Sequence, residues 1–444
     1  MAFRFVHTAD LHLDSPLRSL AMRDPLLRER IDLATREAFD RIIDHCLDER
    51  VDALLIAGDL TDGAQASVKT ALFLQTRLKT LSDAGISSFI VKGNHDARAD
   101  LLRGMEWAER TYLFDGRGTK GISAPRADGA QGFDVVVHGV SFAQEKAPQS
   151  LLPKYARPDG DGSAVHLGLM HTSLAGEGGH DIYAPCPLSD LVAHGYRYWG
   201  LGHVHGRTVH HECGECAVVM PGMPQGRDMG ERGLKSASLV TIHDDGTLTL
   251  GTLATASIEF ARCEVRLVPE MGWDEALEAA EEAVIAASGT EAQGLVARLD
   301  LSGASFEAWR LRRDVEHFRE ALEERLQGGN IHLEKIAIAL DATETGAVVR
   351  GGLSSLSALE ELRQTMALVA EDHEFLAVAR ERADKVMKFL PARLRASRDA
   401  VFGANEAEAD AFLRALVSEG TSDMLARFEG AAREGASPSE RSSP

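Results

Sequence analysis

The sequence predicts a layered α/β domain, then a small α+β domain and a helical C-terminal tail. Over residues 1–255, short β-branched runs alternate with amphipathic helical stretches, as in layered α/β folds. Over residues 256–345, three strand-like runs are separated by two helical segments, which indicates a β-α-β-α-β unit. Over residues 355–430, apolar residues recur at helical spacing, so this part is predicted to be a helical tail.

Size and composition agree with more than one folded domain. A chain of 444 residues with 44% hydrophobic and 26% charged residues is typical of a globular protein. In the first domain, short runs of β-forming residues are the expected strands. They cover residues 3–8, 52–57, 87–92, 134–138, 165–170 and 196–201.

Fewer elements are expected in the second half of the chain. Strands are predicted over 259–268, 295–301 and 331–340, with helices starting near Trp273 and Phe306. A glycine-rich linker at 346–353 precedes the tail, where Ser357 and Glu360 form a capping-box pattern. The polar, aperiodic residues 431–444 are expected to be disordered.

The chain is acidic, with a formal net charge of -20. Proteins that bind duplex DNA without sequence preference usually present basic surface, so any DNA contact of this chain would be local. One basic run on a predicted helix is a candidate for nucleic-acid or partner contact. It consists of Arg380, Arg382, Lys385, Lys388, Arg393, Arg395 and Arg398.

The cysteines and the hydropathy pattern indicate a cytoplasmic protein. Five scattered cysteines do not make a disulfide framework. We find no basic segment followed by an apolar run and no apolar stretch of about 18 residues, so neither export nor a membrane span is expected. Cys213 and Cys216 are interpreted as part of a hairpin between His210 and Val218, because no second pair completes a zinc or redox site.

Short motifs with metal-binding side chains follow the predicted strands. Asp10 and His12 are two residues apart and so project from the same face. Asp59 follows the second strand, and its two carboxylate oxygens can bridge two cations. Asp62, three residues later, is interpreted as the cap of the next helix.

The third motif reads Gly-Asn-His-Asp over residues 93–96. Asn94 can offer its amide oxygen to a metal, and His95 can point at the substrate. Asp96 can accept the other ring N–H of His95 and so fix its orientation.

The last two motifs supply histidines: His171, and the pair His203 and His205. Each motif alone has an ordinary structural explanation, such as a helix cap or a hydrogen-bonded core histidine. All five motifs follow strands, however, and ligands of α/β sheets gather at the carboxyl ends of strands. Imidazole, carboxylate and amide ligands together predict a site for two divalent cations, with manganese, iron or zinc favoured over magnesium.

These motifs resemble the calcineurin-like metallophosphoesterases, and more closely the nuclease subunit of SbcCD-type DNA repair exonucleases. The resemblance covers about the first 250 residues. It rests on residues 10–16 (Asp-Leu-His-Leu-Asp-Ser-Pro), 93–96, 202–205 (Gly-His-Val-His) and 221–226 (Pro-Gly-Met-Pro-Gln-Gly).

The resemblance implies a metallophosphoesterase core with two divalent metal ions, most simply Mn²⁺. One cation would be held by Asp10, His12, Asp59 and His205, and the other by Asp59, Asn94, His171 and His203. His95 would be the catalytic histidine, which protonates the leaving oxygen or stabilises charge in the transition state. Asp96 would orient His95.

The resemblance also implies a DNA exonuclease with endonuclease capacity that works in DNA repair. Residues 256–345 would be a capping domain that positions DNA, although this part is acid-rich. Residues 355–430 would dock on the coiled coil of an ABC-type ATPase. The first domain would form a homodimer.

Two other functions stay open from the sequence. The same metal core could serve a small-molecule phosphodiesterase or a protein phosphatase, for which an acidic surface is no handicap. The chain could also be a scaffold that binds the ATPase partner without cutting DNA, but the intact Asn94-His95-Asp96 string argues against that.

Overall fold

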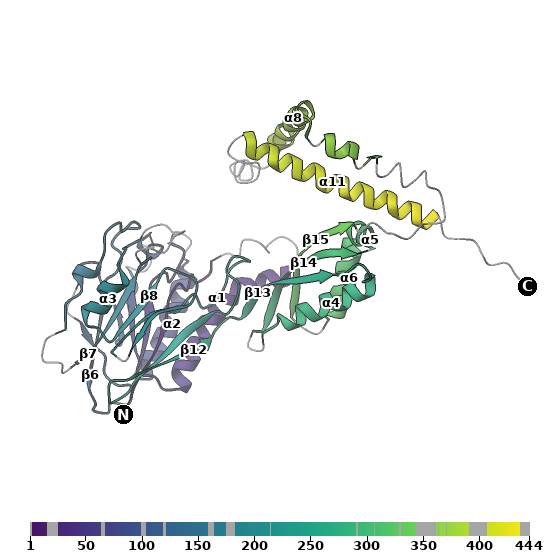
Figure 1. Ribbon diagram of the computed structural model, residues 1–444. Helices are drawn as coiled ribbons and strands as arrows, with labels where there is room; N and C mark the ends of the chain where they lie inside the picture. Colours follow the sequence, from purple (N-terminus) through teal and green to yellow (C-terminus); the bar gives the residue numbers. More distant parts are fainter. Residues whose placement is uncertain are drawn as a thin grey trace, which may run out of the picture. The chain divides into compact units, whose positions relative to one another are not determined.

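The computed structural model describes most of the chain (Figure 1). The described residues are 2–15, 25–63, 67–98, 104–118, 121–158, 164–174, 183–213, 215–289, 292–305, 307–327, 330–342, 361–362, 364–369, 371–389 and 406–435. They fall into two compact units. The first contains Met1–Arg262, Ala286–Ala297 and Gly328–Glu334, and the second contains Cys263–Ile285, Arg298–Gln327 and Lys335–Pro444.

The first unit is built on two six-stranded sheets. One has the order β12-β11-β1-β2-β3-β4, in which β1 to β4 run parallel to one another. Its strands are β1 (Phe3–Thr8), β2 (Ala53–Ala57), β3 (Ser87–Val91), β4 (Thr111–Leu113), β11 (Ser236–Ile242) and β12 (Leu248–Ala254). β11 pairs antiparallel with β1, so a strand that begins at residue 236 lies beside the N-terminal strand.

The second sheet has the order β5-β6-β7-β8-β10-β9, with β6, β7, β8 and β10 parallel. Its strands are β5 (Ile122–Ser123), β6 (Asp134–Gly139), β7 (Ala164–His171), β8 (Tyr198–Gly202), β9 (Thr208–Cys213) and β10 (Cys216–Met220). All six strands predicted for this domain are therefore confirmed to within a few residues. The predicted hairpin between His210 and Val218 is also confirmed, as the antiparallel pair β9 and β10.

Apolar residues on both faces of the strands hold these layers together. In β2, Leu55 packs in the cluster between the two sheets, whereas Leu54 and Ile56 pack against α1 (Pro25–Asp48) and α2 (Val68–Asp83). Both faces of this strand are buried, which explains why its sequence is a continuous apolar run. The outer face of the second sheet packs against the short helix α3 (Leu188–His194).

A three-stranded sheet, β13-β14-β15, follows this sandwich. Its elements are β13 (Ile258–Leu267), α4 (Trp273–Ala286), β14 (Gly294–Ser305), α5 (Ala308–Arg313), α6 (Val315–Arg325) and β15 (Ile331–Ala342). The order matches the predicted β-α-β-α-β unit, except that the second helical stretch is divided into α5 and α6. Trp273 of α4 packs edge-on against Phe318 of α6, with ring centroids 5.2 Å apart.

The tail contains α8 (His373–Phe389) and α11 (Glu406–Gly435), which are joined by an ion pair of 2.9 Å between Arg380 and Asp410. Helix α11 extends over residues 431–435, so the expectation of disorder is wrong there. The alanines and the glutamate in this stretch favour the helix. The predicted linker at 346–353, the capping box at Ser357 and residues 436–444 lie outside the described residues. None of the described helices combines the length and apolar composition of a membrane span.

Candidate metal centre

The loops that follow β1, β2, β3 and β8, together with the last residue of β7, bring the predicted ligands together. Four of these ligands are non-glycine residues with a positive φ: Asp10 (53°), His12 (42°), Asp59 (50°) and His203 (102°). Side-chain-bearing residues rarely adopt this region, and such strain gathers where function requires it. Backbone bonds fix the turns, since the amides of Asp10 and His12 donate to the carbonyls of Gly58 and Asp59, each at 3.0 Å.

Glycine is required where these loops cross most closely. A Cβ on Gly58, which has a φ of 95°, would collide with the ring of His171. A Cβ on Gly93 would collide with the carboxylate of Asp59. The glycines that precede two of the motifs are thus explained by the close approach of neighbouring loops.

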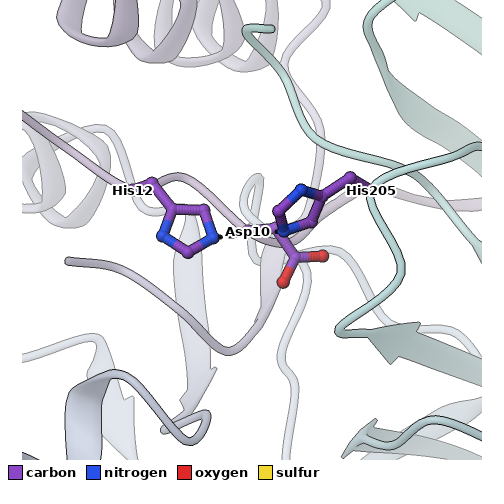
Figure 2. Close-up of side chains that lie close together, drawn as sticks. All are labelled: Asp10, His12 and His205. Atoms are coloured by element: carbon purple, nitrogen blue, oxygen red, sulfur yellow. Dashed lines mark hydrogen bonds between the residues drawn. The ribbon is translucent and has the colours of Figure 1, made fainter. Parts of the chain in front are cut away.

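One group of potential ligands consists of Asp10, His12 and His205, whose donor atoms lie within 4.8 Å of one another. Figure 2 shows that the two imidazoles point toward each other, with Asp10 beside them. Their Nε2 atoms are 3.3 Å apart. The Nδ1 atoms point away, to Asp62 in one case and Glu231 in the other, both at 2.6 Å.

These contacts indicate that the group fits a divalent cation. Each Nδ1 donates its hydrogen to a carboxylate, so in the neutral tautomer each Nε2 carries a lone pair. Two lone pairs facing each other at 3.3 Å repel unless a cation lies between them. The distance suits two neighbouring ligands of one metal ion, since metal–imidazole bonds are about 2.1 Å long.

A second group contains Asp10, Asp59 and His171. His171 donates from Nδ1 to the carbonyl of Ala57 at 2.9 Å, so in the neutral imidazole Nε2 is an acceptor that can bind a cation. This Nε2 faces Oδ1 of Asn94 at 2.9 Å and Oδ2 of Asp59 at 3.4 Å. Three acceptor atoms therefore converge, and a cation would satisfy all of them.

His203 borders the second group. Its ring lies edge-on to that of His171, with centroids 5.2 Å apart, and 5.1 Å from the ring of Tyr183. Its backbone amide lies 3.1 and 3.0 Å from the two oxygens of Asp10. The backbone of one motif thus anchors the carboxylate of another.

In the absence of cations, the buried groups of the centre change one another's ionisation. Burial opposes protonation of His171, but the carboxylates of Asp59 and Asp10 outweigh it and raise the pKa of His171 to about 9. Burial also raises the pKa of Asp10. A neighbouring carboxylate favours a charged imidazole, whereas burial disfavours a charged carboxylate.

His95 lies at the edge of the centre. Its side chain is 46% exposed, and its backbone amide donates to Oδ1 of Asp59 at 3.0 Å. Its Nδ1 lies 3.3 Å from Oδ1 of Asp62, and this contact raises the pKa of His95. The imidazole is therefore open to a substrate on one side and held by a carboxylate on the other.

The expectation that Asp96 orients His95 is wrong. Within the described structure, Asp96 is 1% exposed and accepts hydrogen bonds from the backbone amides of Leu60, Thr61 and Gly93 at 3.0 to 3.1 Å. It ties the loop after β2 to the loop after β3. Asp96 begins a short 3-10 turn (Asp96–Arg98), and both of its carboxylate oxygens are used by backbone amides.

Asp62 takes the place assigned to Asp96, and it is not a helix cap. Besides His95, it accepts hydrogen bonds from Nδ1 of His12 at 2.6 Å and from the hydroxyl of Ser15. Burial opposes its ionisation, but these hydrogen bonds lower the pKa of Asp62 below its ordinary value. Helix α2 is instead capped by Ser67, five residues later in the chain.

Glu231 and Arg227 are two further residues that sequence reasoning missed. Glu231 accepts from Nδ1 of His205 at 2.6 Å and pairs with Arg227 at 2.8 Å. Both lie in the segment between β10 and β11, which has no periodicity and follows no predicted strand. Only the adjacent string at 221–226 marked this segment of the sequence.

A family model described as calcineurin-like phosphoesterase matches residues 3–207. Residues 3–207 form a calcineurin-like phosphoesterase domain. A second model, described as the middle domain of the metallophosphoesterase YhaO, matches residues 260–341, which cover nearly all of the three-stranded sheet.

Three relatives are similar to about half of the chain. The uncharacterized metallophosphoesterase YhaO of Bacillus subtilis is 34% identical over 239 residues, which are 54% of this chain and 57% of that protein. The DNA double-strand break repair protein Mre11 of Methanopyrus kandleri is 25% identical, over 50% of this chain and 49% of that protein. The SbcD component of the nuclease SbcCD of Staphylococcus epidermidis is 26% identical, over 46% and 56%.

The matches thus span about half the length of these relatives. They support a hydrolase of the metallophosphoesterase class that uses divalent metal ions.

Cys213 and Cys216 belong to no ligand group among the described residues. They lie directly opposite each other on the β9–β10 hairpin, Cys213 exposed and Cys216 buried. Nε2 of His211 is 3.1 Å from Sγ of Cys213. This pair is a feature of the hairpin and lies outside the metal centre.

Proposed function

We propose that this protein is a two-metal-dependent DNA phosphodiesterase, an exonuclease with endonuclease capacity that works in DNA repair. The observation that carries the proposal is the convergence of acceptor atoms from both sheets in one buried centre, with His95 exposed beside it. The Mre11 and SbcD names among the relatives favour DNA as the substrate.

The proposed ligands divide into two sets that share Asp59. Asp10, His12, Asp59 and His205 would hold one cation, and Asp59, Asn94, His171 and His203 the other. When bound, two divalent cations would polarise the phosphodiester and supply an attacking hydroxide near neutral pH. Manganese is the proposed metal, because the donors mix imidazole with carboxylate and amide oxygen.

The remaining chemistry falls to groups of the chain itself. His95 would donate a proton from its ring to the leaving oxygen, or stabilise the negative charge that develops on the phosphoryl group. Asp62 would hold the ring with Nδ1 inward, so that Nε2 faces the substrate.

The tail is the proposed docking element for a coiled-coil ATPase of the ABC type. On α8, Val378, Val386 and Phe389 expose 52%, 63% and 90% of their surface, and their spacing returns to one face of the helix. An apolar face of this kind suits a partner helix. Two residues of the basic run proposed for DNA or partner contact form ion pairs within the tail: Arg380 with Asp410, and Lys385 with Glu381. These pairs reduce the positive charge that the run offers to DNA or a partner.

The capping domain at 256–345, a homodimer of the first domain and a cytoplasmic location complete the proposal. A small-molecule phosphodiesterase or a protein phosphatase is the second candidate, favoured by the net charge of -20. These enzymes need no extended basic surface.

Hydrolysis of duplex DNA ends and of a nitrophenyl phosphodiester, each with added Mn²⁺, separates the two candidates. The proposal predicts degradation of DNA by the full-length chain and its loss in His95→Ala. Cleavage of the nitrophenyl ester with DNA left intact would favour the second candidate. Binding of an ABC-type ATPase with neither activity would indicate a non-cutting scaffold.

A further inference from the structure

Glu231 lies outside all five metal-binding motifs, yet it contacts one of the proposed ligands. We infer that Glu231 is a positioning residue for His205, and that it controls the affinity of one of the two metal sites. This inference rests on the proposed function, since it assumes that Asp10, His12 and His205 share a cation. It assigns the segment between β10 and β11 to the metal centre.

The contact between Glu231 and His205 fixes the tautomer of the imidazole. Oε1 of Glu231 accepts from Nδ1 of His205 at 2.6 Å, a short, charge-assisted distance. Nε2 must then carry the lone pair, and it faces Nε2 of His12 at 3.3 Å. A carboxylate behind a ligating imidazole orients the ring and makes it a stronger donor.

The carboxylate of Glu231 is itself rigidly held. Arg227 donates to Oε2 from its backbone amide at 2.8 Å and from Nε at 3.2 Å, and to Oε1 from Nη2 at 2.8 Å. The Glu231 side chain is only 14% exposed. The hydrogen bonds from His205 and Arg227 together occupy both oxygens of the carboxylate.

The same arrangement occurs on the other side of the pair of imidazoles. His12 donates from Nδ1 to Asp62 at 2.6 Å, as His205 does to Glu231. Nη1 of Arg227 lies 3.7 Å from Oδ1 of Asp62. One guanidinium thus balances two carboxylates, each of which supports one imidazole, so that both Nε2 atoms are aimed at the same place.

A purely structural role for Glu231 predicts a different result. If its function were only to close the segment around Arg227, its removal would lower the stability of the metal-free chain and would affect both metal sites together. A positioning role predicts weaker binding of one ion and an unchanged metal-free fold.

The test is a titration of the metal-free full-length chain with Mn²⁺, by equilibrium dialysis and elemental analysis, together with thermal unfolding without metal. In Glu231→Ala we expect one ion to bind as in the wild type and the other to bind about 10 to 100 times more weakly. Glu231→Gln should fall in between, because its amide oxygen still accepts from Nδ1. Glu49→Gln, which removes a carboxylate paired with Arg4 at 2.7 Å, is the matched control.

Two results would overturn the inference. One is binding of both ions by Glu231→Ala and Glu231→Gln with wild-type affinity. The other is a parallel loss of both ions with a lower unfolding temperature of the metal-free variants. A wild-type chain that binds two ions but leaves DNA intact contradicts only the proposed function, because the role of Glu231 is measured as metal affinity. A wild-type chain that binds no Mn²⁺ contradicts both.

Discussion

At the scale of single residues, His95 is the side chain that separates catalysis from metal binding. It is half-exposed, and its ring is held by Asp62. We predict that His95→Ala retains two Mn²⁺ ions per chain and loses hydrolysis by about 10² to 10⁴-fold, as for removal of a general acid. Elemental analysis and rate measurements on the same preparation check this. Loss of metal in parallel with activity would mean that His95 is a ligand.

Asp62 and Asp96 provide a second contrast, because both are largely buried aspartates beside the centre. Asp62→Asn should reduce the hydrolysis rate at least 10-fold with little change in the unfolding temperature, since it weakens the support of His95 and His12. Asp96→Ala should instead destabilise the fold by about 1 to 3 kcal/mol, because it leaves buried backbone amides without an acceptor. Unfolding curves and hydrolysis rates of both variants test these two roles. A loss of rate in Asp96→Ala and a loss of stability alone in Asp62→Asn would instead make Asp96 the partner of His95.

At the scale of elements, helix α2 begins with a capping box. The Ser67 hydroxyl accepts from the amide of Thr70 at 3.1 Å, and the Thr70 hydroxyl accepts from the amide of Ser67. We predict that Ser67→Ala lowers the free energy of unfolding by about 1 kcal/mol. Ser189→Ala is the control in denaturant titrations, since Ser189 makes no capping bond in α3. Equal effects of the two changes would contradict the capping role.

The strands that lead to the centre were predictable, whereas their division between two sheets was not. β1, β2 and β3 are buried on both faces, so their sequences are continuous apolar runs that do not indicate which face meets which layer. The strands β11 and β12 carry weaker patterns and were not predicted.

The candidate site shows the same limit. Its ligands were predictable because each ends or follows a strand, and the carboxyl ends of parallel strands share an edge of the sheet. Asp62 was visible in the sequence but misread, because an aspartate before a helix is usually a cap. Glu231 could not be found, since only the tertiary fold brings it to His205.

At the scale of the whole molecule, buried histidines predict sensitivity to acid. Burial, with a contribution from Arg207, lowers the pKa of His7 to about 3, whereas an unfolded histidine has a pKa of about 6.5. Between pH 3 and pH 6.5, His7 is protonated in the unfolded chain but stays neutral in the folded chain. Stability present above pH 6.5 is therefore lost as the pH falls toward 3, by up to about 1.4 kcal/mol per pH unit.

The corresponding experiment compares the wild type with His7→Gln in the presence of a chelator. Glutamine can still bond the hydroxyl of Tyr198, which lies 2.9 Å from His7. We expect the decline of the unfolding free energy between pH 6.5 and 4 to be shallower in the variant. Identical slopes would exclude His7 as a source of acid sensitivity.

Metal binding should stabilise the first unit, because ligands from distant parts of the chain come together only when it is folded. At Mn²⁺ concentrations about 100 times the dissociation constant, we expect about 2.7 kcal/mol of added stability. Thermal unfolding with Mn²⁺ or chelator measures this. His171→Ala should reduce the increment, and an unchanged unfolding temperature in the wild type would argue against the metal centre.

The strained turns and the two-sheet sandwich have a consequence for synthesis of the chain. Asp10, His12, Asp59 and Asn94 leave the ribosome early, whereas the imidazoles from the second sheet follow only when β7 and β8 have been made. Until then the first half presents carboxylates without their partners, and a metal ion would be held weakly. The centre can therefore form only after most of this domain has been translated.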